Sequence, residues 1–207
     1  LFATDHDTIK EHIDMLERVG LVPRGIDPLP CAHFRSLHQQ GIDQANREQT
    51  VVYVDVGCRY TTIAFGRKGQ LCFVKQIAVG AERFDEVIAD KLGVDKLEAH
   101  ALRLKLQTQR DDHEMVSPGN SVTSVCRHRA LEASDSSPVL EHSTYQTLID
   151  GIRSVAGELA HELSRCLRYY TVTFRGQRIR HVALCGGGAN EGMLLDVLRT
   201  QLGCDVH

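Results

Sequence analysis

Apolar residues recur at helical spacing in several segments of the chain. The longest pattern covers 145–170, where apolar side chains keep to one face for about six turns and predict a long amphipathic helix. Near the start, Thr8 and Glu11 have the spacing of a capping box, and Gly20 follows as a stop. The same kind of pattern predicts further helices over 8–19, 27–38, 82–92, 95–107 and 191–202.

Runs of β-branched and apolar residues predict strands between these helices. They lie at 50–56, 61–65, 70–75 and 179–184, with a short additional strand at 21–26. The run at 50–56 is apolar almost throughout, so we expect it to be buried on both faces. The segment 66–69 contains two glycines and predicts a hairpin turn between the second and third of these strands. The succession of strands and helices predicts an α/β protein.

Two polar stretches interrupt the pattern. Residues 41–49 predict a loop, and 107–143 is rich in Ser, Asp, His, Pro and Gly with few apolar positions. We interpret 107–143 as a flexible insertion, with a binding loop as the alternative.

Composition narrows the classes of function. The 207 residues suffice for one sizeable core or two small lobes, and the net charge of -3 gives no basic field for nucleic acid or anionic lipid. No apolar run reaches the ~18–20 residues that span a bilayer. The chain begins at Leu1 and not at Met, from which we expect that its natural beginning is missing. Seven cysteines without a CxxC pair predict reduced thiols in a cytosolic protein, and eleven histidines show no metal-ligand spacing.

An acidic residue stands near the end of the buried strand 50–56. Asp55 would be costly to bury there unless a partner such as hydrated Mg²⁺ compensated its charge. Gly57 lets backbone N–H groups turn toward a phosphate, and Thr61 and Thr62 add hydroxyls. The alternative is an aspartate that caps its own turn.

Three consecutive glycines, Gly186, Gly187 and Gly188, follow the last predicted strand and precede a helix. A tight strand-to-helix turn requires one or two glycines, so the third needs another reason, such as an adenine or ribose passing over the main chain. A purely steric packing requirement is the alternative. The run matches neither the P-loop nor the dinucleotide fingerprint. We expect this loop and the loop at Gly57 to face each other across a common crevice.

Five segments, taken together and in order, resemble the PilM family of actin-like proteins of type IV pilus assembly and, more distantly, the FtsA family. They are 17–23 with the following Ile26-Asp27, 54–62, 73–80, 163–170 and 184–190. The resemblance implies an actin-like, ribonuclease-H-like lobe with a mixed sheet flanked by helices, and an incomplete first lobe. Residues 1–48 would be the remnant of the first lobe, and 49–207 would be the second lobe with the insertion 107–143.

The same resemblance implies ATP and Mg²⁺ as cofactors of the complete protein. Asp55 would orient water or hold Mg²⁺ through water, and the second phosphate motif would include Asp55, Gly57, Thr61 and Thr62. The adenosine site would include Gly186, Gly187, Gly188 and Asn190. Gly80 stands where the family has paired glycines, and His100 and Arg103 replace an acid and a lysine that approach the sugar and base.

A scaffold that recruits partner proteins is the function that the resemblance implies. The partner would be the tail of an inner-membrane, PilN-like pilus assembly protein, and the location would be cytoplasmic and peripheral to the inner membrane. Oligomers agree with this function, and we expect no nucleic-acid partner because the chain has no basic field. The departures at Gly80, His100 and Arg103 motivate an alternative, a degenerate interaction module that binds no nucleotide. A sugar or acetate kinase would need an acceptor pocket and a catalytic acid, which the sequence does not identify.

Overall fold

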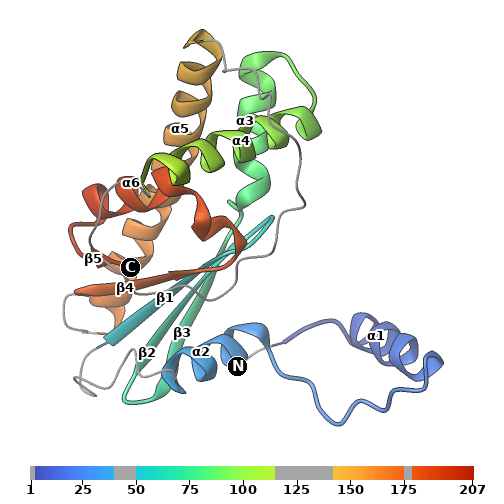
Figure 1. Ribbon diagram of the computed structural model, residues 1–207. Helices are drawn as coiled ribbons and strands as arrows, with labels where there is room; N and C mark the ends of the chain where they lie inside the picture. Colours follow the sequence, from blue (N-terminus) through green and yellow to red (C-terminus); the bar gives the residue numbers. More distant parts are fainter. Residues whose placement is uncertain (1–2, 40–49, 115–141, 175–178) are drawn as a thin grey trace.

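A mixed sheet of five strands forms the centre of the part of the chain that the structure describes. The computed structural model describes residues 3–39, 50–114, 142–174 and 179–207. Figure 1 shows α2 on one side of the sheet and the helices α3 to α6 on the other. The elements in chain order are α1 (His6–Arg18), α2 (Leu29–Gln39), β1 (Thr50–Val56), β2 (Thr61–Arg67), β3 (Gln70–Ile77), α3 (Ala81–Leu92), α4 (Lys96–Glu114), α5 (His142–Thr173), β4 (His181–Cys185), the 3₁₀ turn η1 (Gly187–Asn190), α6 (Gly192–Leu202) and β5 (Asp205–Val206).

The five strands lie in the order β3-β2-β1-β4-β5. β1 pairs with β2 and β2 with β3 in antiparallel fashion, whereas β1–β4 and β4–β5 are parallel. Short connections can only produce antiparallel neighbours, while the long excursion through α3, α4 and α5 brings β4 back parallel to β1. The prediction of an α/β chain with a mixed sheet is therefore confirmed.

The hairpin turn between β2 and β3 is tighter than predicted. Arg67 pairs with Gln70, so Lys68 and Gly69 alone form the turn. Both have positive φ, 55° and 73°, as a two-residue turn of this hand requires. Gly66, expected in the turn, belongs to β2 instead, and a side chain there would collide with the ring of Phe34 on α2.

The central strand β1 is buried on both faces, as expected. Val52, Val54 and Val56 of β1 point into the main core together with α3, α5 and α6. Tyr53 points to the other face, where it meets Phe34 of α2. The alternation of neighbouring residues between the two faces places Asp55 on the α2 side of the sheet.

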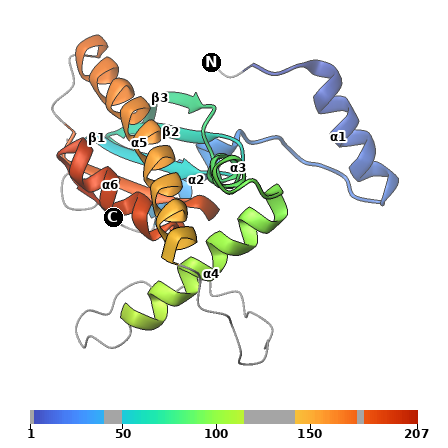
Figure 2. The same ribbon diagram turned by 90° about the horizontal axis from the view of Figure 1, so that it is seen from above.

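Helix α1 lies away from the sheet, as Figures 1 and 2 show, and none of its residues is buried. It begins earlier than predicted, because Asp5 is the N-cap and accepts a hydrogen bond from the backbone N–H of Thr8. The expected capping box of Thr8 and Glu11 is therefore wrong. The strand expected at 21–26 is absent as well, and this segment has no regular structure.

Both boundaries of the polar insertion differ from the prediction. α4 continues to Glu114 and α5 begins at His142, so 107–114 and 142–143 are helical. Residues 107–114 include no apolar residue, so the pattern of apolar residues could not indicate the end of α4. The remaining part of the insertion, 115–141, and the whole predicted loop at 41–49 lie outside the described residues. In the ranges that are described, no helix is both long and apolar enough to cross a membrane.

Candidate functional site

The two segments singled out in the sequence meet at one edge of the sheet. β1 and β4 are parallel neighbours, and Asp55 is in register with Cys185. The loop beginning at Gly57 and the glycine run beginning at Gly186 therefore leave the sheet side by side. Carboxyl ends of adjacent parallel strands are the usual position of ligand sites in α/β proteins.

The glycine run packs directly on the end of β1, beside the loop that begins at Gly57. A Cβ atom on Gly186 would collide with the carboxylate of Asp55 and lie 2.6 Å from the carbonyl oxygen of Val56. A Cβ atom on Gly188 would lie 2.5 Å from a methyl group of Val56. Packing against β1 thus explains two of the three glycines.

Gly187 has no such packing reason. It is exposed, its φ is not positive, and a Cβ atom there would meet nothing within 4 Å. The steric alternative therefore accounts for Gly186 and Gly188 but leaves Gly187 unexplained. A surface over which a flat ligand passes closely would require a glycine at this position.

Asp55 is mostly buried on the α2 face, with 16% of its side chain exposed. Nδ1 of His33 on α2 lies 3.3 Å from its Oδ2. Thr62 is directly opposite Asp55 in the register of β1 and β2, so its side chain shares this face. His33 was not among the residues predicted for the site, because only the packing of α2 onto the sheet brings it close.

Cys185 completes this face of the site. Its thiol lies 3.5 Å from the carbonyl oxygen of Val54 and can donate a hydrogen bond to it. Burial and then the charge of Asp55 raise the pKa of the Cys185 thiol to about 11. The thiol therefore stays protonated at neutral pH and adds no negative charge beside Asp55.

The loop after β1 also caps the start of α3. The backbone N–H of Gly57 donates to the carbonyl of Tyr60 at 3.0 Å. The N–H groups of Ala81 and Glu82 donate to the carbonyls of Gly57 and Cys58, at 2.9 and 2.8 Å. These bonds use two donors of the first turn of α3, which would otherwise be available to an anion.

Gly80 and Thr61 help to fix the loop between β1 and β2. A Cβ atom on Gly80, the N-cap of α3, would collide with the backbone of Cys58, lying 2.6 Å from its carbonyl carbon. Thr61 is fully buried, and its hydroxyl donates to the carbonyl of Val79 at 2.7 Å. The Thr61 hydroxyl is therefore committed to the protein, whereas Thr62 is only partly buried.

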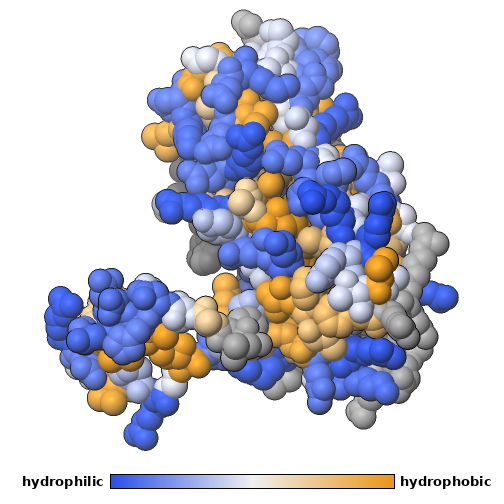
Figure 3. Space-filling model, turned by 180° about the vertical axis from the view of Figure 1, so that it is seen from behind, coloured by the Kyte–Doolittle hydropathy of each residue, from blue (hydrophilic) through white to orange (hydrophobic). Residues whose placement is uncertain are grey.

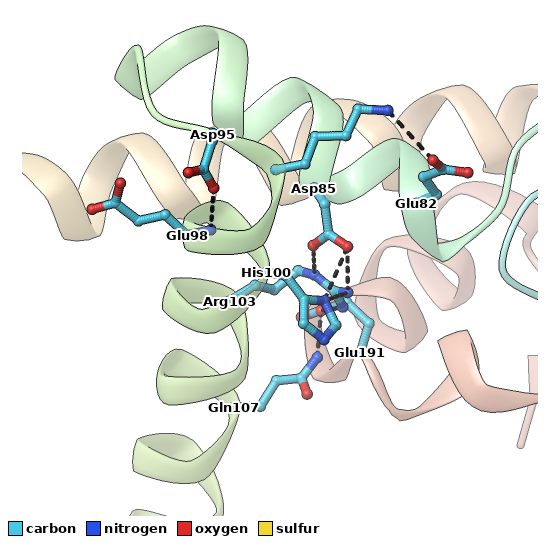
Figure 4. A network of polar contacts seen from close by, with 9 residues as sticks. Glu82, Asp85, Asp95, Glu98, His100, Arg103, Gln107 and Glu191 are labelled. Carbon is cyan, nitrogen blue, oxygen red and sulfur yellow. Dashed lines mark hydrogen bonds and ion pairs between the residues drawn. The ribbon is translucent and has the colours of Figure 1, made fainter.

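His100 and Arg103 lie on α4 in a network of polar contacts shown in Figure 4. Nε of Arg103 donates to Oδ1 of Asp85 on α3 at 2.7 Å, and Nη1 donates to Oε2 of Glu191 at 3.1 Å. Nδ1 of His100 lies 3.0 Å from Oδ2 of Asp85, and Gln107 donates to Glu191. Burial lowers the pKa of Arg103, but the hydrogen bonds and charges of Asp85 and Glu191 raise it by more.

This network connects α3 and α4 to the glycine-rich loop. Glu191 directly follows η1, and its backbone N–H donates to the carbonyl of Gly188 at 3.3 Å. The guanidinium of Arg103 is nearly inaccessible, with 6% of the side chain exposed, whereas 45% of the His100 side chain is exposed. Asp85 and Glu191 were not predicted as site residues, since an acidic residue on an amphipathic helix or before one gives no signal in the sequence.

The structure thus brings the predicted residues together in two groups. Asp55, Gly57, Thr62 and the glycine run share one sheet edge, with Asn190 exposed at the end of η1. Arg103 and His100 lie on α4, and Arg103 is connected to the glycine run through Glu191. In the part of the chain that the structure describes, no three His, Cys, Asp or Glu side chains are grouped so that they could hold a metal ion.

This arrangement of sheet and helices is the actin-like fold. No protein-family model and no curated protein sequence matches the chain. Among solved structures, the PilM–PilN type IV pilus biogenesis complex matches with a TM-score of 0.66 and 21% identity over 96% of this chain and 46% of that one. The ethanolamine utilization protein EutJ from Carboxydothermus hydrogenoformans matches with a TM-score of 0.64 and 16% identity over 99% and 57% of the two chains.

An archaeal actin homologue shows the same fold at greater distance, with a TM-score of 0.52 and 14% identity over 90% of this chain and 48% of that one. The chain therefore spans about half the length of these proteins. At the level of the fold it is similar to PilM, which confirms the fold that the resemblance implied.

Proposed function

We propose that this protein is an ATP-binding, actin-like scaffold of type IV pilus or related secretion machinery. It would work at the cytoplasmic side of the inner membrane and recruit partner proteins there. The fold shared with PilM and with an archaeal actin homologue supports this class of function. Because the chain covers about half of those proteins, the proposal concerns the complete protein.

The observation that carries the nucleotide part is the exposed, sterically unnecessary Gly187 beside the Asp55 loop. An open main-chain surface and a carboxylate lie at one sheet edge, which suits a nucleotide whose sugar or base rests on the glycines. Its phosphates would then extend toward Gly57 and Thr62. The exposed face of His100 would hydrogen-bond a ribose hydroxyl.

Asp55 fits a Mg²⁺ ion held through water. Mg²⁺ keeps several waters and is typically bound through one or two carboxylates together with substrate phosphates. A single, partly exposed carboxylate beside the Thr62 hydroxyl agrees with that donor set. When bound, the ion would neutralise charge on the phosphates, and Asp55 would orient one of its waters.

The partner in this proposal is the cytoplasmic tail of a PilN-like protein. The PilM structure that shares this fold was determined as a complex with PilN. ATP would bias the protein between conformations that differ in affinity for that tail. Hydrolysis would be slow, because phosphate positioning requires the motifs of both lobes.

One observation favours a second candidate, an interaction module that binds no nucleotide. Arg103 stands where the family has a lysine that approaches the base, but Asp85 and Glu191 already engage its guanidinium. A buried guanidinium bound by two carboxylates is not free for a ligand. In this alternative the glycine-rich loop is only a structural turn.

Titration of labelled ATP with Mg²⁺ onto the full-length protein separates the two candidates. We expect saturable binding, lost in Asp55→Ala and Gly187→Val, and a stabilisation of ~2.7 kcal/mol at a hundredfold excess over Kd. Gly157→Ala on α5, where a Cβ atom would make an ordinary 3.7 Å contact, is the matched control and should bind like the wild type. Circular dichroism verifies that Gly187→Val is folded. An unchanged melting temperature with ATP would favour the module without nucleotide.

A further inference from the structure

A groove of about 750 Å³ lies between the edge strand β3 and the carboxyl-terminal half of α5. Its apolar lining includes Phe73 of β3 with Tyr169 and Val172 of α5, and its cations are Lys75, Arg165 and Arg168. Seen from behind, the molecule shows hydrophobic side chains gathered over this region with hydrophilic ones around them (Figure 3).

Two of the groove's lining residues, Phe73 and Tyr169, belong to a larger cluster of aromatic rings. Phe65 stacks on Tyr170 with ring centroids 4.4 Å apart, and Tyr170 stacks on Phe174 at 5.0 Å. Phe73 adds contacts with Tyr169 at 5.6 Å and with Phe174 at 5.8 Å. The outer members of this cluster remain accessible, since Tyr169 is 54% and Phe174 is 44% exposed. A contiguous exposed aromatic surface is typical of interaction sites.

β3 offers its backbone to the same groove. It is the last strand of the sheet on this side, so the N–H and C=O groups of its outer edge face away from β2. An extended segment laid beside β3 would take up these groups, and every second side chain of that segment would point toward α5. The recognised sequence would therefore have a period of two.

The charge of the groove indicates which polar residues the segment carries. Glu162 is paired with Arg165 at 2.7 Å, whereas Lys75 and Arg168 form no ion pair with another residue in the described ranges. Both are exposed. The groove is thus locally cationic in a chain whose net charge is -3, which favours an acidic partner.

We propose that this groove binds an extended segment of a partner protein in which aromatic or large apolar residues alternate with acidic ones. The segment would add to β3 as a sixth strand, its apolar residues against Phe73, Tyr169 and Val172, and its carboxylates near Lys75 and Arg168. This is a site of protein interaction that is separate from the candidate nucleotide site.

The register of the sheet keeps the two sites apart. Phe73 pairs with Phe65, and Phe65 pairs with Val52 near the amino end of β1. The glycine-rich loops follow the opposite, carboxyl ends of β1 and β4. Failure of nucleotide binding would therefore leave this proposal standing, and the reverse also holds.

The test measures fluorescence anisotropy of a labelled peptide of about eight residues, with phenylalanine and glutamate in strict alternation, added to the full-length protein without nucleotide. We expect saturable binding that is at least about tenfold weaker in the double variant Lys75→Glu/Arg168→Glu. Val172→Asp, at a residue that is 74% exposed, should weaken binding as well without unfolding the chain. Arg153→Glu, also exposed on α5 but outside the groove, is the matched control and should bind unchanged.

Two further peptides test the mode of binding. Lysine in place of every glutamate should abolish binding, and N-methylation of alternate amides that would face β3 should do the same, because it removes backbone donors. The proposal is overturned if the peptide does not saturate below ~1 mM, or if the lysine peptide binds equally well. It is also overturned if the groove variants instead lose self-association in sedimentation, or lose binding to phosphatidylserine vesicles, since a second copy or a membrane would then occupy the groove.

Discussion

Replacing Arg103 should strongly destabilise the protein, because its charge is buried between two carboxylates. Its side chain is 6% exposed and lies between Asp85 and Glu191, whose side chains are 13% and 3% exposed. Arg103→Met keeps much of the apolar stem but leaves two carboxylates in a poorly hydrated site without their cation. Removing one partner of a buried ion pair typically costs ~3–5 kcal/mol. In this variant Asp85 still has His100 as a hydrogen-bond partner, and Glu191 still has Gln107. We therefore expect the free energy of unfolding to fall by about 3–4 kcal/mol.

Urea denaturation followed by circular dichroism measures this loss. In a chain of this size, ~1 kcal/mol corresponds to roughly 2–4 °C, so the melting temperature should fall by about 6–16 °C. The matched control is Arg83→Met on α3, whose partners Glu86 and Glu158 lie at 3.2 and 3.7 Å but whose side chain is 43% exposed. Surface pairs contribute about 0–1 kcal/mol, so this variant should unfold almost like the wild type.

Neutralising the carboxylates separates charge from packing. Adding Asp85→Asn and Glu191→Gln to Arg103→Met should restore at least half of the lost stability, because no uncompensated charge then remains. The reasoning is refuted if Arg103→Met unfolds within about 1 kcal/mol of the wild type, or if the triple variant is less stable than Arg103→Met. Either result would mean that the contributions of Arg103, Asp85 and Glu191 to stability are independent of one another.

Three further predictions concern residues around the carboxyl ends of β1 and β4. Gly188→Ala should lower the free energy of unfolding in urea by ~1–3 kcal/mol, because the new Cβ atom would lie 2.5 Å from Val56. Gly187→Ala should be near neutral, and equal effects of the two substitutions would contradict the packing described. Thr61→Val should lose about 1–2 kcal/mol through the hydrogen bond to Val79, and Thr62→Val clearly less; the reverse order of midpoints would be evidence against this assignment. Folding raises the pKa of Cys185 from 9.0 to about 11, so stability is retained below pH 9 and decreases as the pH rises toward 11. Cys185→Ala should reduce that decrease in alkaline unfolding curves, and an unchanged slope would show that the thiol is not buried as described.

The sequence alone located most of the elements of the second half of the fold. These elements leave local patterns in the sequence: the apolar run of β1, the hairpin β2–β3 and the apolar stripe of α5. Such a pattern follows from which faces of the element are buried, so it can be read without knowing the fold. Asp55 and the three consecutive glycines could also be singled out in the sequence. A carboxylate in an apolar strand and a run of glycines are both energetically costly, so each indicates a special role. The resemblance of five short segments then indicated an actin-like fold, which the structure confirms.

Tertiary structure decided which of these elements meet. Strand order placed β4 beside β1, so Gly186 and Gly188 pack directly on the end of β1, whereas a side chain at Gly187 would meet nothing within 4 Å. The partners of Arg103 are 18 and 88 residues away in sequence, and no periodicity relates such distant positions. His33 reaches Asp55 only because α2 covers that face of the sheet. The aromatic groove likewise exists only because the end of α5 lies over the edge strand β3, and contacts of this kind depend on the packing of whole elements and not on local sequence.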